Sequence, residues 1–323
     1  MKNRTLKFLT VGTAMAAVLA FGSMSAGAEE TEAVTEAAEE ETEAYTGDAS
    51  QDNPRNQDEI SEKELLVVSF GTSFNDSRVA TIGAIENAME ASFPDFSVRR
   101  AFTAQIIIDH VKSRDGEVID NMTEALDRAV ENGVKTLVVQ PTHLMNGIEY
   151  DEMNQMLAEY SDVFETIAVG APLLTSDEDF TTVEKAITEW TKDYDDGETA
   201  IVFMGHGTEA ESNQIYSRMQ ELLKADGYEN YFVGTVEASP SLEDVLAAVK
   251  EGNYKKVILE PLMIVAGDHA NNDMAGEEEG AWKKTFEDAG YEVECVLRGL
   301  GENEAVQQLL VAHAQVAVDS LAE

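Results

Sequence analysis

The sequence predicts an α/β protein built from two duplicated lobes, each with a parallel sheet, and a central cleft between them. Two observations carry this prediction. From residue 63 onward, short β-branched runs alternate with longer amphipathic stretches, the pattern of parallel strands covered by helices on both faces. The segment 134–141 (VKTLVVQP) also matches segment 254–261 (YKKVILEP) at an offset of 120 residues. Paired units of this kind bind ligands at the carboxyl ends of their strands, in the cleft between them.

The first 28 residues have the features of a secretory signal peptide. Three cations precede an apolar run of about 15 residues, and a small-x-small pattern at 26–28 supplies a cleavage site. The alternative is an uncleaved anchor, but the run is short for a bilayer span of roughly 20 residues. No cysteine follows the run, so a lipoprotein anchor is not indicated. We therefore expect an exported protein, periplasmic or extracellular, with no membrane span after cleavage.

Strong acidity marks the next segment and the whole chain. Residues 29–62 hold 13 acidic side chains and one arginine, a composition typical of a disordered tether. The full chain of 323 residues carries a formal net charge of −41, which excludes nucleic acid as a partner because phosphate binding requires clustered Lys and Arg. The single Cys295 excludes a disulfide framework and any cysteine-based metal site.

The two lobes are expected at 63–193 and 194–323, each with four strands. The strands predicted for the N-terminal lobe are 65–70, 96–101, 135–140 and 164–170. Those of the C-terminal lobe are 200–204, 231–236, 255–260 and 291–297. The chain ends in a helix with one apolar stripe, which includes His313 as a packing residue.

Three side chains that could bind a metal follow strands of the C-terminal lobe. His206 stands in G-H-G-T directly after the first strand, Glu237 ends the next strand in V-G-T-V-E, and His269 follows the third in A-G-D-H. All three are expected at one edge of one sheet, where two imidazoles and a carboxylate suit a borderline cation such as Co²⁺, Ni²⁺, Fe²⁺ or Zn²⁺. The alternatives without a metal are a helix-capping histidine at 206 and a surface carboxylate at 237.

The remaining motifs point to simpler roles or to none. His110 is interpreted as structural, whereas His143 follows a strand and faces the cleft, so packing and function both remain open for it. Segment 205–210 formally fits GxGxxG/A, but its imidazole would occupy the phosphate-approach turn, which disfavours a dinucleotide. No GxxxxGK[ST] and no GxSxG occurs, so neither a P-loop enzyme nor an α/β-hydrolase triad is supported.

Five strings occur in order along the chain: LLVVSFGTS, NGIEY, FMGHG, VGTVE and PLMIVAGDHANNDM. Together they closely resemble the anaerobic, ATP-independent sirohydrochlorin cobaltochelatases, which are relatives of ferrochelatase. The resemblance runs from about residue 63 to the end. It implies two flavodoxin-like lobes with a tetrapyrrole cleft between them, in agreement with the duplication.

The resemblance also implies roles for individual residues. His206, Glu237 and His269 match the residues that hold the incoming Co²⁺ in that family, and the two histidines are candidates to accept pyrrole protons. Glu149, in N-G-I-E-Y, matches a glutamate placed in the cleft opposite the metal; the internal alignment independently sets it opposite His269. For the substrate's eight carboxylates we consider a weaker set of candidates: Arg99, Arg100, Ser69, Thr72 and Ser73.

The resulting functional expectation is insertion of Co²⁺, with Fe²⁺ and Ni²⁺ also considered, into sirohydrochlorin in cobalamin or tetrapyrrole biosynthesis. No cofactor is expected beyond the substrate metal ion. The alternative is a non-catalytic extracytoplasmic carrier of metal, haem or a related tetrapyrrole, because an export signal does not match cytoplasmic cobalamin synthesis. An interaction module without a ligand is disfavoured by the four intact site residues. A homo-oligomer is compatible with the sequence.

Overall fold

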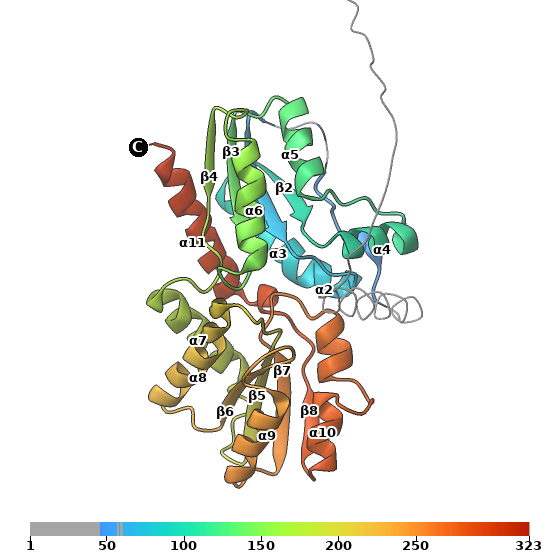
Figure 1. The fold of residues 1–323 in the computed structure, drawn as a ribbon, viewed down its shortest axis with the longest axis vertical. Helices are drawn as coiled ribbons and strands as arrows, with labels where there is room; N and C mark the ends of the chain where they lie inside the picture. The colour runs from blue at the N-terminus through green and yellow to red at the C-terminus, as the bar shows by residue number, and fades with distance from the viewer. Residues whose placement is uncertain (1–45, 57, 59–60, 323) are drawn as a thin grey trace, which may run out of the picture.

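The structure is a computed structural model that describes residues 46–56, 58 and 61–322. In this part of the chain, two four-stranded parallel sheets form, and helices cover them (Figure 1). The predicted α/β fold of two lobes is therefore confirmed. The predicted signal peptide, residues 1–28, lies outside the described residues, as do residues 29–45 of the predicted tether.

The first sheet has the strand order β2-β1-β3-β4, and all neighbours are parallel. Its strands are β1 (Lys63–Ser69), β2 (Ser97–Phe102), β3 (Thr136–Pro141) and β4 (Thr166–Val169). The helical elements between them are α2 (Asn75–Arg78), the π-helical turn η3 (Val79–Gly83), α3 (Ala84–Ser92), α4 (Gln105–Asp115), α5 (Met122–Glu131) and α6 (Ile148–Glu159). A short 3₁₀ turn, η2 (Ala49–Gln51), precedes the sheet.

The second sheet repeats this order as β6-β5-β7-β8. Its strands are β5 (Thr199–Gly205), β6 (Tyr231–Thr235), β7 (Lys256–Pro261) and β8 (Glu292–Cys295). The helical elements are η4 (Glu211–Asn213), α8 (Gln214–Ala225), α9 (Leu242–Glu251), η5 (Ala270–Met274), α10 (Trp282–Asp288) and η6 (Leu300–Glu302). The register repeats as well, because Pro141 pairs with Val68 just as Pro261 pairs with Met204. All eight predicted strands are confirmed to within a few residues at each end.

Two long helices join the lobes: α7 (Asp177–Thr191) and α11 (Glu304–Ser320). From the sequence, α11 is expected within the C-terminal lobe. Instead α11 packs against α3, β3 and β4 of the first lobe and against α7, whereas α7 also contacts α8 (Figure 1). The reason is the apolar stripe of α11, whose Leu310 belongs to one buried cluster with Leu65 of β1 and Phe203 of β5. One continuous core therefore connects both sheets through these helices.

The segment just before β1 corrects the predicted tether, which was expected to run from residue 29 to 62. Thr46 and Arg55 are buried, and the carboxylate of Asp52 is 2 % exposed. Asp52 accepts hydrogen bonds of 2.6 Å from both Arg78 and Arg100. The density of acidic residues predicted disorder, but here individual charges complement buried charges of the first lobe. Residues 46–56 therefore pack against the first lobe instead of belonging to a tether.

A membrane-spanning helix would have to be long and apolar, and among the helices in the described ranges none meets both conditions.

Candidate metal centre

His206 lies directly after β5, in a tight turn between two glycines. At Gly205 a Cβ would lie 2.1 Å from Cε1 of Tyr216, and Gly207 has φ +90°, so a larger residue would be strained at both positions. The phenol oxygen of Tyr216 accepts a hydrogen bond from the amide of Gly207. The imidazole Nδ1 lies 2.8 Å from the carbonyl oxygen of Gly207. These contacts hold the exposed His206 ring with Nε2 free to bind a ligand.

Glu237 stands beside this turn because the ladder between β5 and β6 continues past the ends of the strands. The amide of Val236 donates to the carbonyl of Gly205 (3.0 Å), and the amide of Glu237 donates to that of His206 (2.8 Å). The carboxylate of Glu237 is exposed, so it is open to a ligand from solvent.

His269 comes from the loop after β7, immediately before η5. Its Nδ1 lies 2.7 Å from Oδ2 of Asp273, one turn further along. A carboxylate on one ring nitrogen sets the tautomer and orients the other nitrogen, which is the usual arrangement behind a metal-binding histidine. Burial opposes the charged form of His269, but Asp273, together with Asp268 and Glu237, outweighs burial and raises the pKa of this imidazole.

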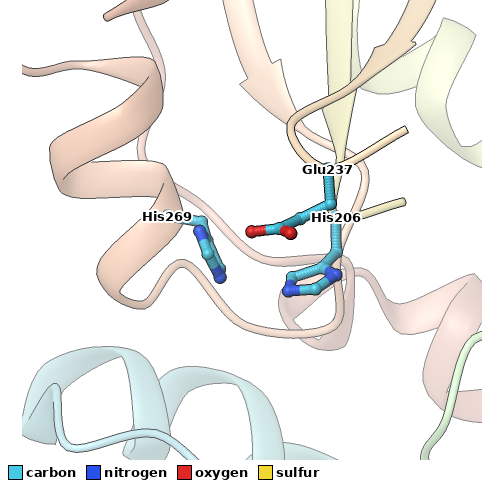
Figure 2. Close-up of side chains that lie close together, drawn as sticks. All are labelled: His206, Glu237 and His269. Atoms are coloured by element: carbon cyan, nitrogen blue, oxygen red, sulfur yellow. The ribbon is translucent and has the colours of Figure 1, made fainter. Parts of the chain in front are cut away.

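The three side chains converge from three loops (Figure 2). One ligand atom from each of His206, Glu237 and His269 lies within 4.8 Å of the others. The two rings stand nearly perpendicular, at 81°, with centroids 4.6 Å apart. Two imidazole nitrogens and a carboxylate oxygen are donors that suit borderline divalent cations. Strand positions alone predicted this convergence. They did not indicate Asp273 or Tyr216, whose contacts become visible only in three dimensions.

Glu149 and His143 belong to the other lobe. Glu149 is exposed in the first turn of α6, and a Cβ on Gly147 would lie 3.5 Å from its Oε2 and 3.7 Å from Oγ of Ser212. Because Ser212 belongs to η4 of the second lobe, Glu149 lies where the two lobes meet. His143 follows β3, and burial lowers its pKa to about 4, against the opposing charge of Glu149. His143 is therefore a neutral imidazole close to this carboxylate at neutral pH.

The residues considered for binding substrate carboxylates are not available for that role. Arg100 is 1 % exposed and is paired with Asp52 and Glu86. Arg99 is also buried and donates to the carbonyl of Arg55. The three hydroxyl residues at the end of β1 are buried as well: Ser69, Thr72 and Ser73. The prediction was wrong because it took residues at a strand end to be accessible, although the first sheet is covered on both faces.

His313 packs in α11 as predicted, yet it is not purely apolar in its contacts. Its Nδ1 lies 3.1 Å from the carbonyl of Ala171, and its Nε2 lies 3.1 Å from Asp179 in α7. It therefore links α11 to α7 and to the loop after β4.

Comparison with known proteins identifies relatives over nearly the whole folded part. The family model described as cobalt chelatase (CbiK) matches residues 63–319. The sirohydrochlorin cobaltochelatase of Salmonella typhimurium is 35% identical over 262 residues, which cover 81% of this chain and 98% of that protein. The sirohydrochlorin cobaltochelatase CbiKC of Nitratidesulfovibrio vulgaris is 29% identical over 264 residues, covering 81% and 93%. The solved structure of SirB from Bacillus subtilis with Fe³⁺ shares the fold, with a TM-score of 0.58 at 12% identity and coverage of 81% and 98%.

Proposed function

The chain belongs to the cobalt chelatase (CbiK) family, and from this premise we propose that it inserts Co²⁺ into sirohydrochlorin without ATP. The observation that carries the proposal is the convergence of His206, Glu237 and His269 within 4.8 Å. The curated relatives that match across 81% of the chain are named for this reaction. The absence of a P-loop motif from the sequence agrees with independence from ATP.

The proposed role of the three side chains is to hold the metal ion, which is a substrate, until the macrocycle takes it. The His206 and His269 rings each have Nδ1 engaged, with Gly207 and Asp273 respectively, so both offer Nε2 to the ion. Glu237 supplies a negative charge that offsets part of the cation's charge. A set of three protein donors leaves further coordination positions for ring nitrogens, so transfer can proceed by stepwise replacement of ligands.

Metal insertion also releases two pyrrole protons, and Glu149 is proposed as their first acceptor. Its carboxylate is exposed where the lobes meet and comes from the lobe that does not carry the metal ligands. General base catalysis of this kind contributes about 10²- to 10⁴-fold to a rate.

Fe²⁺ and Ni²⁺ are proposed as alternative metal substrates, because imidazole and carboxylate donors accept each of these ions and intrinsic affinity would favour Ni²⁺ over Co²⁺. Competition between equimolar Co²⁺ and Ni²⁺ for the apoprotein, followed by insertion, separates affinity from turnover. Faster insertion of Ni²⁺ at saturating concentrations of both ions would contradict cobalt as the preferred substrate.

Export is proposed on the basis of the signal-like residues 1–28. The mature N-terminus, determined by mass spectrometry from an envelope or culture fraction, should begin close to residue 29. An intact N-terminus in the cytoplasmic fraction would contradict export and favour cytoplasmic tetrapyrrole synthesis.

The test of function is the visible spectrum of sirohydrochlorin mixed with Co²⁺ and the purified protein. We expect many turnovers per protein molecule, abolished in His206→Ala and retained in His110→Ala, a histidine of α4. A shift that stops at one equivalent would indicate a carrier of the metallated ring instead of an enzyme. Conversion of sirohydrochlorin at the rate measured without protein would contradict both the enzyme and the carrier.

A further inference from the structure

His143 is a partly buried histidine that the candidate metal centre does not use. It follows β3, at the carboxyl edge of the first sheet. Both of its ring nitrogens are shielded from solvent, and neither has a hydrogen-bond partner among the described residues. Buried polar groups are nearly always hydrogen-bonded, because an unsatisfied one costs free energy. We therefore looked to the reaction for a partner of this imidazole, because the protein without substrate provides none among the described residues.

Glu149 is the charged group that acts on His143. Its carboxylate opposes the effect of burial on the pKa of this imidazole. Burial chiefly raises the pKa of Tyr216 to about 12, and the same carboxylate adds to that effect. Tyr216 belongs to α8 of the second lobe and accepts a hydrogen bond from Gly207, next to His206. Glu149 therefore acts electrostatically on His143 of one lobe and on Tyr216 of the other, which contacts the loop that carries His206.

A second buried polar group without a hydrogen-bond partner lies near Glu149. The hydroxyl of Ser212 is buried without a hydrogen-bond partner in the part of the chain that the structure describes. A Cβ on Gly147 would touch both this hydroxyl, at 3.7 Å, and Oε2 of Glu149, at 3.5 Å. Two polar side chains without partners among the described residues therefore lie near one carboxylate, where they are available to a ligand or to an added proton.

The proton balance of the proposed reaction identifies a task for this histidine. A divalent ion replaces two pyrrole protons, so two N–H bonds break for each ion inserted. The Nε2 lone pairs of His206 and His269 are occupied while they hold the ion. Glu149 can accept one proton and is then neutral, so it cannot accept the second until the first has moved on.

We propose that His143 receives the first proton from Glu149 and so restores the carboxylate for the second pyrrole proton; this inference rests on the proposed function. In the first transfer a pyrrole N–H bond breaks, its electron pair stays on nitrogen to bind the metal, and an O–H bond forms on Glu149. That O–H bond then breaks as an N–H bond forms on His143. The second pyrrole proton moves to Glu149, and both protons pass to water when the product leaves.

A neutral imidazole beside a carboxylate suits this transfer. Burial keeps His143 unprotonated at neutral pH, so a lone pair is available before turnover begins. Once protonated, the imidazolium is stabilised by the restored charge of Glu149, and this attraction strengthens when substrate excludes water from the site. His143 is thus a positioning residue that acts through Glu149 and not a group that contacts the ring.

The first test compares His143→Gln with His110→Gln, a matched change in a lobe-one histidine of α4. For His143→Gln we expect kcat of Co²⁺ insertion to fall on the order of 10²-fold, the lower end for loss of a general base. The Kd for Co²⁺, titrated without tetrapyrrole, should change less than twofold, because the metal ligands are untouched. His110→Gln should retain both values. An unchanged kcat in His143→Gln, with an active wild type, would overturn the inference and leave the proposed function intact.

The second test separates a proton-transfer role from a packing role. In His143→Gly, added imidazole should restore turnover increasingly as pH rises through its own pKa and more of it becomes the free base. Pyrrole, a ring of the same size without a basic nitrogen, should not. Restoration by both rings would show that His143 only fills space, which overturns the inference.

A third variant tests the path through Glu149. Imidazole should fail to restore the double variant His143→Gly/Glu149→Gln, because no carboxylate relays the proton. Equal restoration with and without Glu149 would contradict the relay. An inactive wild-type protein in these assays would instead refute the proposed function itself.

Discussion

Replacing Asp273 with Asn tests whether the carboxylate behind His269 sets the affinity of the metal centre. The 2.7 Å contact from Asp273 Oδ2 to Nδ1 fixes the tautomer that presents Nε2 to the ion, and its charge makes that nitrogen more basic. Loss of such a partner typically weakens metal binding about 10- to 100-fold. That range corresponds to roughly 1.4 to 2.7 kcal/mol of binding free energy.

The pH dependence of this loss follows from the direction of the pKa shift. Asp273 raises the pKa of His269, so protons compete with the metal up to a higher pH in the wild type. In Asp273→Asn the pKa of His269 falls, so this competition weakens at low pH. The deficit in Co²⁺ affinity should therefore be larger at pH 8 than at pH 6.

The assay is a titration of the apoprotein with Co²⁺, followed by visible absorption at both pH values. Asp288→Asn is the matched control, because it removes the same charge from α10, where Asp288 pairs with Lys284. A Kd within twofold of wild type at both pH values would refute the argument that Asp273 positions His269. An equal loss in the control would show that the effect is one of total charge.

Three further predictions concern stability and can be checked by denaturant unfolding of each variant. Burial raises the pKa of Asp52, but its two arginine partners lower it overall to about 2. Its ionisation should therefore contribute roughly 2 kcal/mol to the free energy of unfolding, and this contribution is lost as pH falls from 3.8 toward 2. Asp52→Asn should remove this dependence of stability on acidic pH. Burial raises the pKa of Glu64 from 4.5 to about 7, so ionisation of Glu64 opposes folding. As pH rises from 4.5 to 8, Glu64→Gln should become more stable than the wild type by up to about 3 kcal/mol in free energy of unfolding. Gly205→Ala should cost about 1 to 3 kcal/mol and weaken Co²⁺ binding, because the new Cβ would displace the buried Tyr216. Gly83→Ala, where φ is −58° and the nearest atom is 3.5 Å away, should instead stabilise by about 0.5 to 1 kcal/mol; the reverse order of these two glycine variants would contradict the steric argument.

Most of the fold could be predicted because two independent signals agree in this chain. Strand periodicity located every strand of the described residues, and the repeat at an offset of 120 residues predicted two copies of one four-stranded unit. The course of α11 could not be predicted, because an apolar stripe shows that a helix packs but not against which lobe. The packing of residues 46–56 could not be predicted either, since charge density says nothing about the pairing of one aspartate, Asp52, with two buried arginines.

The convergence of the three candidate metal ligands was predictable for a topological reason. His206, Glu237 and His269 follow successive strands of one parallel sheet, so their positions along the chain determine a common edge. Asp273 and Tyr216 could not be predicted by the same reasoning, since their roles depend on how a helical turn and a side chain are oriented. Arg100 shows the opposite failure, because a strand-end position indicated access where the structure has a buried ion pair.

The duplication explains why the two lobes differ in chemistry although they share a backbone. The internal alignment sets Thr72 opposite His206 and Glu149 opposite His269. Thr72 is 2 % exposed, and its hydroxyl accepts a hydrogen bond from the amide of Phe74. It lies against Gly267 of the second lobe, so this position in the first lobe serves packing between the lobes. Of the two positions in the first lobe, Glu149 is the one that stays exposed. On the proposed function, the second lobe therefore presents metal to the ring while the first presents a base, so that the cation and the departing protons take separate routes.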